Sequence, residues 1–406
     1  MSFDWNSSFA ERVKGMAASE IRELLKLLDR PEIISFAGGI PDPDLFPYDR
    51  VDAANHAIIT DPKRRAQALQ YSVSEGYLPL RQWICDRMRA NGVACDPDDV
   101  LITNGSQQGL DFLGKLLIGR GERVIVTAPT YLGALQAFSA YQPEYVSVPM
   151  DENGVLLEPL EEALKGGAKL LYLVPDFQNP TGVTLSAERR PKIVEMAAKY
   201  GVPVVEDAAY EQLRYEGAQI PPLASHAPAD PAGGLGGNVI YLGTFSKTVI
   251  PGLRVGWTVA PRPLIQKMVL VKQASDLTVS AANQMVMYEL VREGFEQHLD
   301  TLRDAYRTRR DAMLSAIAEH FPQQVKWNHP QGGMFVWLDL PQGIDGAELL
   351  KQAITENNVA FVPGAAFFAD RSGRNTCRLS FSAVPPEKIR EGIARLGALL
   401  RSRLAA

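Results

Sequence analysis

Short apolar runs alternate with helical patterns through the middle of the chain. The runs are rich in β-branched residues and lie at residues 100–103, 124–127, 169–174, 202–206, 239–243 and 255–259. Helical patterns lie between several of them, for example over residues 188–200. Strands that are buried on both faces and separated by helices are typical of a largely parallel sheet covered by helices. In such a sheet, ligands bind beyond the carboxyl ends of the strands.

The two ends of the chain carry patterns of their own. Residues 19–28 place Ile21, Leu24, Leu25 and Leu28 on one face of an amphipathic helix, with Ser19 as its N-cap. After about residue 290 a long helical stretch leads into a second α/β segment, with strands expected at residues 334–339, 359–362 and 378–381.

These patterns predict an α/β fold in three parts. Residues 1–45 form an N-terminal helix and loop. Residues 46–290 form a large domain with a mostly parallel central sheet flanked by helices. Residues 291–406 form a smaller α/β domain, against which the N-terminal segment packs.

Composition excludes several classes of protein. The 406 residues include 42 Lys and Arg against 47 Asp and Glu, for a net charge of −5. No basic surface for nucleic acid or for an anionic membrane is therefore indicated. The longest apolar runs, such as residues 170–175, are far shorter than the ~20 residues of a membrane-spanning helix.

The cysteines and the first residues bear on where the protein works. Three scattered cysteines, Cys85, Cys95 and Cys377, favour neither a disulfide framework nor a zinc site. Residues 1–6 lack the pattern of a secretory signal. We therefore expect a cytoplasmic protein with reduced thiols and no metal ion.

Lys247 is the strongest candidate for a chemical role. It follows a buried strand within the apolar segment 243–257. A lysine in such surroundings is costly to ionise, and a desolvated amine is a good nucleophile that forms an imine with an aldehyde cofactor. Ser246 and Arg254 flank it and supply a hydroxyl and a guanidinium suited to a phosphate. The alternative is a surface lysine at a strand end.

Two further strand ends carry polar residues. After residue 103 a helix is expected to begin in Asn-Gly-Ser106-Gln-Gln, where backbone N–H groups and the Ser106 hydroxyl face an anion. Asp207 ends another strand and needs a cation, such as a protonated pyridine nitrogen. Glu206 should point to the opposite face, and Tyr210 is placed to donate to a ring oxygen of a cofactor. An ordinary N-cap serine and a helix-capping aspartate are the alternatives.

Asn179 and Tyr131 also follow strands. Asn179 precedes a proline in the turn 175–182, where its amide can face a ligand oxygen, and turn formation alone explains the segment equally well. Tyr131, in Pro-Thr-Tyr, offers a ring that stacks on a flat cofactor, with simple core packing as the alternative.

Together these segments resemble one family. The order of Asn-Gly-Ser-Gln-Gln, Pro-Thr-Tyr, Asn-Pro-Thr-Gly, Asp-x-x-Tyr, Ser-Lys and Pro-Gly-Leu-Arg is similar to that of the fold-type I, class I/II aminotransferases, which use pyridoxal 5'-phosphate (PLP). The resemblance implies the PLP-dependent transferase fold and an imine at Lys247. It implies these further cofactor contacts: Ser106, Gln107, Ser246 and Arg254 at the phosphate, Tyr131 over the ring, Asn179 and Tyr210 at the ring oxygen, and Asp207 at the ring nitrogen.

The resemblance extends to the substrate and to a second subunit. Arg378, in Asn-Thr-Cys-Arg-Leu-Ser, matches the arginine that binds the α-carboxylate of the substrate. Tyr71 matches a tyrosine that reaches the cofactor phosphate of the neighbouring subunit, which implies a homodimer with shared active sites.

The segments Ser35-Phe-Ala-Gly-Gly-Ile-Pro and Gln331-Gly-Gly-Met-Phe-Val-Trp are similar to the 2-aminoadipate and kynurenine aminotransferase II group. In that group the N-terminal helix covers the substrate. Gly39 then lies by the substrate and Arg22 meets a distal carboxylate, with a solvated helix face as the alternative for Arg22.

The family's activity is the transfer of an amino group from an L-amino acid to a 2-oxo acid by a ping-pong cycle. Donors such as 2-aminoadipate, glutamate or aliphatic and aromatic amino acids, and an acceptor such as 2-oxoglutarate, are implied. A β-lyase or a decarboxylase on the same cofactor is the alternative, because a fold does not fix a reaction. A PLP-sensing regulator would need a basic helix-turn-helix module in the first ~80 residues, where no such pattern occurs.

Overall fold

The structure is a computed structural model that describes residues 3–15 and 30–405. The predicted helix at 19–28, with Ser19 and Arg22, lies outside the described residues. Within the described part, no helix is long and apolar enough to cross a membrane.

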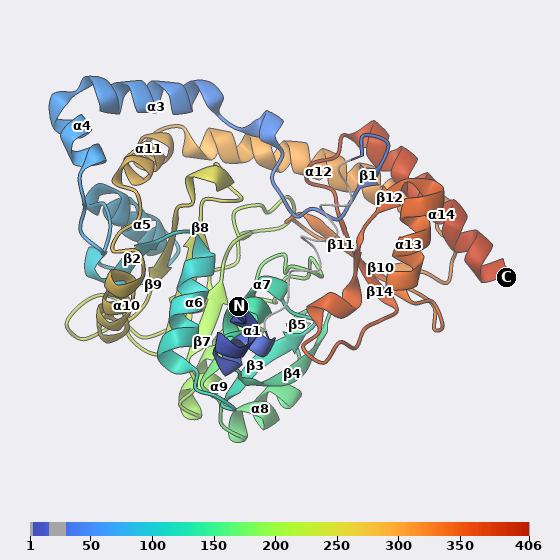
Figure 1. The fold of residues 1–406 in the computed structure, drawn as a ribbon, viewed down its shortest axis with the longest axis horizontal. Coiled ribbons are helices and arrows are strands. Elements are labelled where there is room, and N and C mark those ends of the chain that lie inside the picture. Colours follow the sequence, from blue (N-terminus) through green and yellow to red (C-terminus); the bar gives the residue numbers. More distant parts are fainter. Residues whose placement is uncertain (1–2, 16–29, 406) are drawn as a thin grey trace.

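An eight-stranded sheet forms the centre of the larger part of the molecule (Figure 1). Its strand order is β2-β9-β8-β7-β6-β3-β4-β5. The strands are β2 (Val100–Thr103), β3 (Arg123–Ala128), β4 (Glu144–Asp151), β5 (Gly154–Val155), β6 (Leu170–Leu173), β7 (Val204–Asp207), β8 (Val239–Thr244) and β9 (Gly256–Val259).

The predicted parallel sheet is confirmed. Strands β8, β7, β6, β3 and β4 pair in parallel, while β9 runs antiparallel to both β2 and β8. β9 reverses direction because only a short turn at 245–255 separates it from β8, too little chain for a crossover helix. β4 and β5 were missed, since β4 is half-exposed and lacks a continuous apolar run.

Helices cover both faces of this sheet. The helices of this part are α3 (Tyr48–Thr60), α4 (Pro62–Leu69), α5 (Leu78–Ala90), α6 (Ser106–Leu117), α7 (Leu132–Ser139), α8 (Leu157–Lys165), α9 (Arg189–Lys199), α10 (Arg262–Ser275) and α11 (Ala281–Arg292). α6 contacts α7 and α10 on one side, and α8 contacts α9 on the other. All of the longer strands between them except β4 are almost fully buried, as expected for a sheet with two covered faces.

A second, four-stranded sheet lies at the other end of the molecule (Figure 1). It contains β10 (Lys326–Trp327), β11 (Phe335–Asp339), β14 (Thr376–Ser380) and β13 (Val362–Pro363), in that order. Helices α13 (Gly346–Asn357) and α14 (Pro386–Ala405) belong to this part, and α12 (Phe295–His320) runs toward it from α11.

One predicted strand was wrong in its extent. Residues 359–362 do not form a single strand, because the chain switches sheets at Phe361. β12 (Val359–Ala360) pairs in parallel with β1 (Ile34–Ser35), whereas β13 pairs with β14. The N-terminal loop that follows β1 is thereby fixed against the smaller sheet, with the backbone N–H of Ser380 donating to the carbonyl of Phe36.

Candidate functional site

The predicted site segments meet at one edge of the large sheet. The parallel strands β2, β3, β6, β7 and β8 all end there, and β9 starts there because it runs the other way. The polar turns that follow β2, β3, β6, β7 and β8 are therefore brought together, although they are far apart in the sequence. Arg378 reaches the same place from β14 of the smaller sheet.

Lys247 lies in the turn after β8. Its Nζ donates to the carbonyl of Gly39, at 2.8 Å, and lies 6.0 Å from the centre of the Tyr210 ring. Desolvation, together with the positive charges of Arg378 and Arg254, lowers the pKa of Lys247 to about 8, and the negative charge of Asp207 opposes this shift. About one tenth of this amine is therefore neutral, and hence nucleophilic, at pH 7, far more than for a lysine with an ordinary pKa.

A cradle for an anion lies beside Lys247. α6 begins at Ser106, and Gly105 before it takes a left-handed φ of 73°. Nη1 of Arg254 donates to Oγ of Ser246 at 3.3 Å. A Cβ atom on Gly105 would lie 2.5 Å from Nη2 of Arg254, so only glycine lets the guanidinium come this close to the helix start. Hydroxyl, guanidinium and helix N-terminus together suit a phosphate.

Gln107 connects this cradle to the turn after β3. Its Nε2 donates to the carbonyl of Gly133, at 2.8 Å. A Cβ on Gly133 would meet the ring of Tyr131 at 2.4 Å, so this ring lies directly against the backbone there. The structure thus places Gln107 and the partly buried Tyr131 near each other.

Asp207 and Glu206 point to opposite faces of the sheet, as expected. Glu206 accepts from the backbone N–H groups of Leu223 and Ala224 at 2.7 and 2.9 Å. Asp207 accepts instead from the hydroxyl of Tyr172, at 2.7 Å through Oδ2. Burial raises the pKa of Asp207 to about 6, although the Tyr172 hydroxyl, the backbone N–H of Ala209 and the Lys247 charge all favour the ionised form.

The remaining oxygen of Asp207 is the clearest sign of a bound group. Oδ1 is buried and has no hydrogen-bond partner among the described residues. Such an oxygen is costly unless a donor meets it. A protonated ring nitrogen is a suitable donor, and the lysine and the anion cradle lie at the same edge. The residues present therefore fit PLP.

Arg378 lies between the two sheets and is 2% exposed. Its Nη1 donates to Oδ1 of Asn179 at 2.8 Å, and its Nη2 donates to the carbonyl of Ala37 at 2.7 Å. Asn179 in turn donates to the hydroxyl of Tyr210 at 3.4 Å. Burial lowers the pKa of Arg378 to about 10, so the side chain remains charged at neutral pH and suits a carboxylate.

Two predicted residues are not placed at this edge by the single chain. Tyr71 follows α4 and is 81% exposed. Arg22 lies outside the described residues. Conversely, the sequence did not predict Tyr172 as a residue of this site, because Tyr172 lies within an apolar strand with the pattern of the hydrophobic core. The available signal was its hydroxyl, since a buried tyrosine needs a hydrogen-bond partner.

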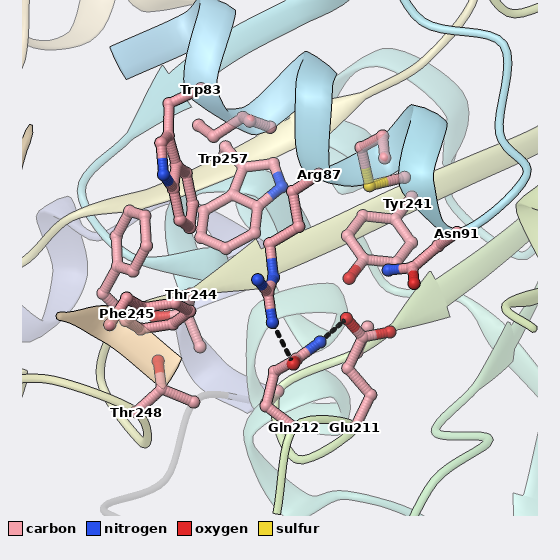
Figure 2. Close-up of a pocket in the computed structure, with 15 residues that line it drawn as sticks. Trp83, Arg87, Asn91, Glu211, Gln212, Tyr241, Thr244, Phe245, Thr248 and Trp257 are labelled. Atoms are coloured by element: carbon pink, nitrogen blue, oxygen red, sulfur yellow. Dashed lines mark hydrogen bonds between the residues drawn. The ribbon is translucent and has the colours of Figure 1, made fainter. Parts of the chain in front are cut away.

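A small cavity lies on the Glu206 face of the sheet, behind the turn that follows Asp207 (Figure 2). Trp83, Arg87 and Trp257 line it, and Arg87 contacts Gln212, which donates to Glu211. Its volume of about 20 Å³ holds roughly one water molecule. It is too small for a substrate. Among residues 3–15 and 30–405, no cluster of His, Cys, Asp or Glu suits a metal ion.

Comparisons with known proteins agree with this geometry. Residues 43–396 match the family described as aminotransferase class I and II. The chain is 44% identical to the 2-aminoadipate transaminase of Thermus thermophilus, over 99% of this chain and 98% of that protein. It is 43% identical to aromatic-amino-acid aminotransferase 1 of Thermococcus litoralis, over 99% and 96%. The crystal structure of an alpha-aminoadipate aminotransferase from Thermus thermophilus, complexed with N-(5'-phosphopyridoxyl)-L-leucine, superposes with a TM-score of 0.90 at 42% identity, over 99% and 100% of the two chains.

Proposed function

We propose a substrate range and a set of residue roles for this chain, which belongs to the aminotransferase class I and II family and is a PLP-dependent aminotransferase. The donors are L-amino acids that include 2-aminoadipate, glutamate and aromatic amino acids, and the acceptor is a 2-oxo acid such as 2-oxoglutarate. The names of the relatives support this range. Because these relatives are aminotransferases, transamination is favoured over the β-lyase and decarboxylase alternatives.

The observation that carries the roles is the meeting of Lys247, the unpartnered Oδ1 of Asp207 and Arg378 at one edge of the sheet. When bound, the cofactor supplies an aldehyde carbon and a ring that withdraws electrons. Lys247 holds the cofactor. Once the amino acid has displaced it, the free amine of Lys247 moves the proton at the Cα of that amino acid. Asp207 keeps a proton on the ring nitrogen, and Asn179 and Tyr210 hold the ring oxygen.

Other residues bind and orient. Ser106, Gln107, Ser246 and Arg254 hold the phosphate, and Tyr131 covers the ring. Arg378 and Asn179 bind the α-carboxylate of the substrate, next to the backbone of Gly39. In this proposal residues 1–45 cover the site, 46–290 bind the cofactor and 291–406 form the smaller domain. Arg22 then meets a distal carboxylate of the substrate.

A half-reaction with a single donor tests the reaction type. An aminotransferase incubated with an amino acid alone converts its cofactor to pyridoxamine phosphate and releases a 2-oxo acid, whereas a β-lyase releases pyruvate and ammonia and leaves the cofactor unchanged. Lys247→Ala should abolish this conversion, while Lys267→Ala, an exposed lysine on α10, should not alter it. Full conversion by the Lys247 variant would contradict the assignment.

A panel of donors with 2-oxoglutarate tests the substrate range. Arg22→Ala should lower kcat/KM for 2-aminoadipate far more than for leucine, because only the former carries a distal carboxylate. Equal losses for both donors would remove Arg22 from the site.

The proposed assembly is a homodimer in which Tyr71 completes the partner's site. Leu69, Tyr71, Val73 and Leu277 are 72%, 81%, 59% and 43% exposed. The hydroxyl of Thr278 donates to the carbonyl of Val73, so these apolar residues belong to neighbouring segments. Clustered exposed apolar side chains are typical of an interface. A cytoplasmic location is part of the proposal and is supported by the free thiols of Cys85, Cys95 and Cys377.

Subunit mixing tests the shared site. Lys247→Ala and Tyr71→Ala chains are each expected to be impaired. A mixed dimer contains one site with an intact Lys247 from one chain and an intact Tyr71 from the other, so exchange of subunits should restore activity to that site. If mixing restores nothing although mixed dimers form, Tyr71 does not act across the interface.

A further inference from the structure

Tyr172 and Asp207 are neighbours by strand register. Tyr172 on β6 is paired with Val205 on β7. Paired residues point to the same face, and so do residues two apart on one strand. Tyr172 and Asp207 therefore share a face and lie diagonally across the two strands. This geometry brings the phenol to the carboxylate at 2.7 Å, although the residues are 35 positions apart in the sequence.

The tyrosine has no freedom to serve another partner. It is 0% exposed, and Phe138 of α7 packs edge-on against its ring with centroids 6.0 Å apart. Burial raises the pKa of Tyr172 well above its usual value, so the phenol keeps its proton. A buried O–H must donate to avoid the cost of an unmade hydrogen bond, and Oδ2 of Asp207 receives it.

The two oxygens of Asp207 therefore differ in what they do. Oδ2 is occupied by Tyr172, and Oδ1 is buried without a partner among the described residues. A hydrogen bond to one carboxylate oxygen both fixes the rotation of the group and stabilises its charge. Only Oδ1 is then left for the cofactor.

We propose that Tyr172 is a positioning residue for the transamination reaction, which holds Asp207 ionised with its Oδ1 directed at the ring nitrogen of PLP. The inference rests on the proposed role of Asp207. It adds a residue that touches neither substrate nor cofactor and that acts through the carboxylate.

The experiment removes one oxygen. Tyr172→Phe keeps the ring and its packing, and deletes the donor. A matched control is Tyr141→Phe, because Tyr141, in the turn after α7, also donates to a carboxylate, Oδ1 of Asp111 on α6, at 2.8 Å. For each variant the dissociation constant of PLP is measured from about pH 5 to about pH 9, a range that spans the pKa of the carboxylate, together with kcat at saturating PLP and the thermal midpoint.

Tyr172→Phe is expected to weaken PLP binding about tenfold, the lower end of the effect of a hydrogen bond to a charged group. The acid limb of PLP binding should also move to higher pH. The groups that act on Asp207 are Tyr172, Tyr210, Lys247 and the backbone N–H of Ala209. Removing the Tyr172 donor raises the pKa of the carboxyl, so the carboxyl is protonated sooner as the pH falls. Tyr141→Phe should change neither quantity.

The proposal fails if Tyr172→Phe binds PLP as tightly as the wild type with the same pH dependence. It fails equally if the variant only lowers the thermal midpoint, since that is the result of lost packing alone. Failure of the proposed function looks different, because the wild type itself would then not convert its cofactor when given an amino acid.

Discussion

Replacing Arg378 by leucine should separate substrate recognition from cofactor binding. The guanidinium is 2% exposed, and it is held by Asn179 and Ala37 at 2.8 and 2.7 Å. The rings of Phe335 and Phe367 lie 4.4 and 5.0 Å from its central carbon. The guanidinium is thus fixed before a substrate arrives, and leucine removes both its charge and its paired N–H donors.

The size of the effect follows from the number of hydrogen bonds to the substrate carboxylate. Each bond to a charged group contributes about 1.5–3 kcal/mol, so losing two costs about 3–6 kcal/mol. At 1.4 kcal/mol per factor of ten, kcat/KM for an amino acid should fall by about 10²–10⁴. Arg378→Lys keeps the charge but offers no planar fork, and it should lose about 10–10².

The assay compares an amino acid with an amine that lacks the α-carboxylate. Steady-state kcat/KM is measured for both donors in the wild type and in the two variants, and PLP affinity is measured by titration. Only the amino acid should be affected, and PLP should bind normally. The reasoning would be refuted by equal losses for both donors, or by an Arg378→Leu enzyme within about threefold of the wild type, less than one such bond contributes.

Three further variants, one of them paired with a control variant, test other contacts. Asp207→Asn should weaken PLP binding at least about tenfold, while Glu206→Gln, on the opposite face, should not. Because burial raises the pKa of Asp207 to about 6, the affinity of the wild type for PLP should fall as the pH drops through that value. Gly39→Ala would bring a Cβ to 2.9 Å from Phe335, so the loop must shift. KM for the amino acid should rise, and PLP affinity should change as well because the carbonyl of Gly39 accepts from Lys247. Lys272→Met breaks the ion pair between the buried Lys272 and Asp276, whose side chain is 25% exposed. Urea unfolding should show that the free energy of unfolding falls by about 2–3 kcal/mol, less than the roughly 3–5 kcal/mol that breaking a fully buried pair costs.

Much of the site could be predicted because it is built from strand ends. The apolar runs located β2, β6, β7 and β8, and each of these ends where the polar turn begins. Alternation along a strand also separated Asp207 from Glu206 correctly, since neighbouring residues face opposite sides. Local patterns suffice where position along a strand determines the direction of a side chain.

The rest depends on contacts between distant segments. Nothing in its own strand marks Tyr172 as a partner of Asp207, because this contact follows from the order of strands in the sheet. Arg378 was found only through family resemblance, since its strand belongs to another sheet. β4 was missed because its exposed positions break the apolar pattern, and residues 359–362 were joined because a switch between sheets leaves no gap in hydrophobicity.

The loop after β1 touches two cationic side chains of the candidate site. The carbonyl of Ala37 accepts from Arg378, and that of Gly39 accepts from Lys247. Peptide dipoles thus counter two positive charges before any anion or aldehyde arrives, and an incoming ligand must compete with them. Occupancy of the site and the position of this loop are therefore linked energetically, and by reciprocity whatever shifts the loop also changes the affinity for both ligands.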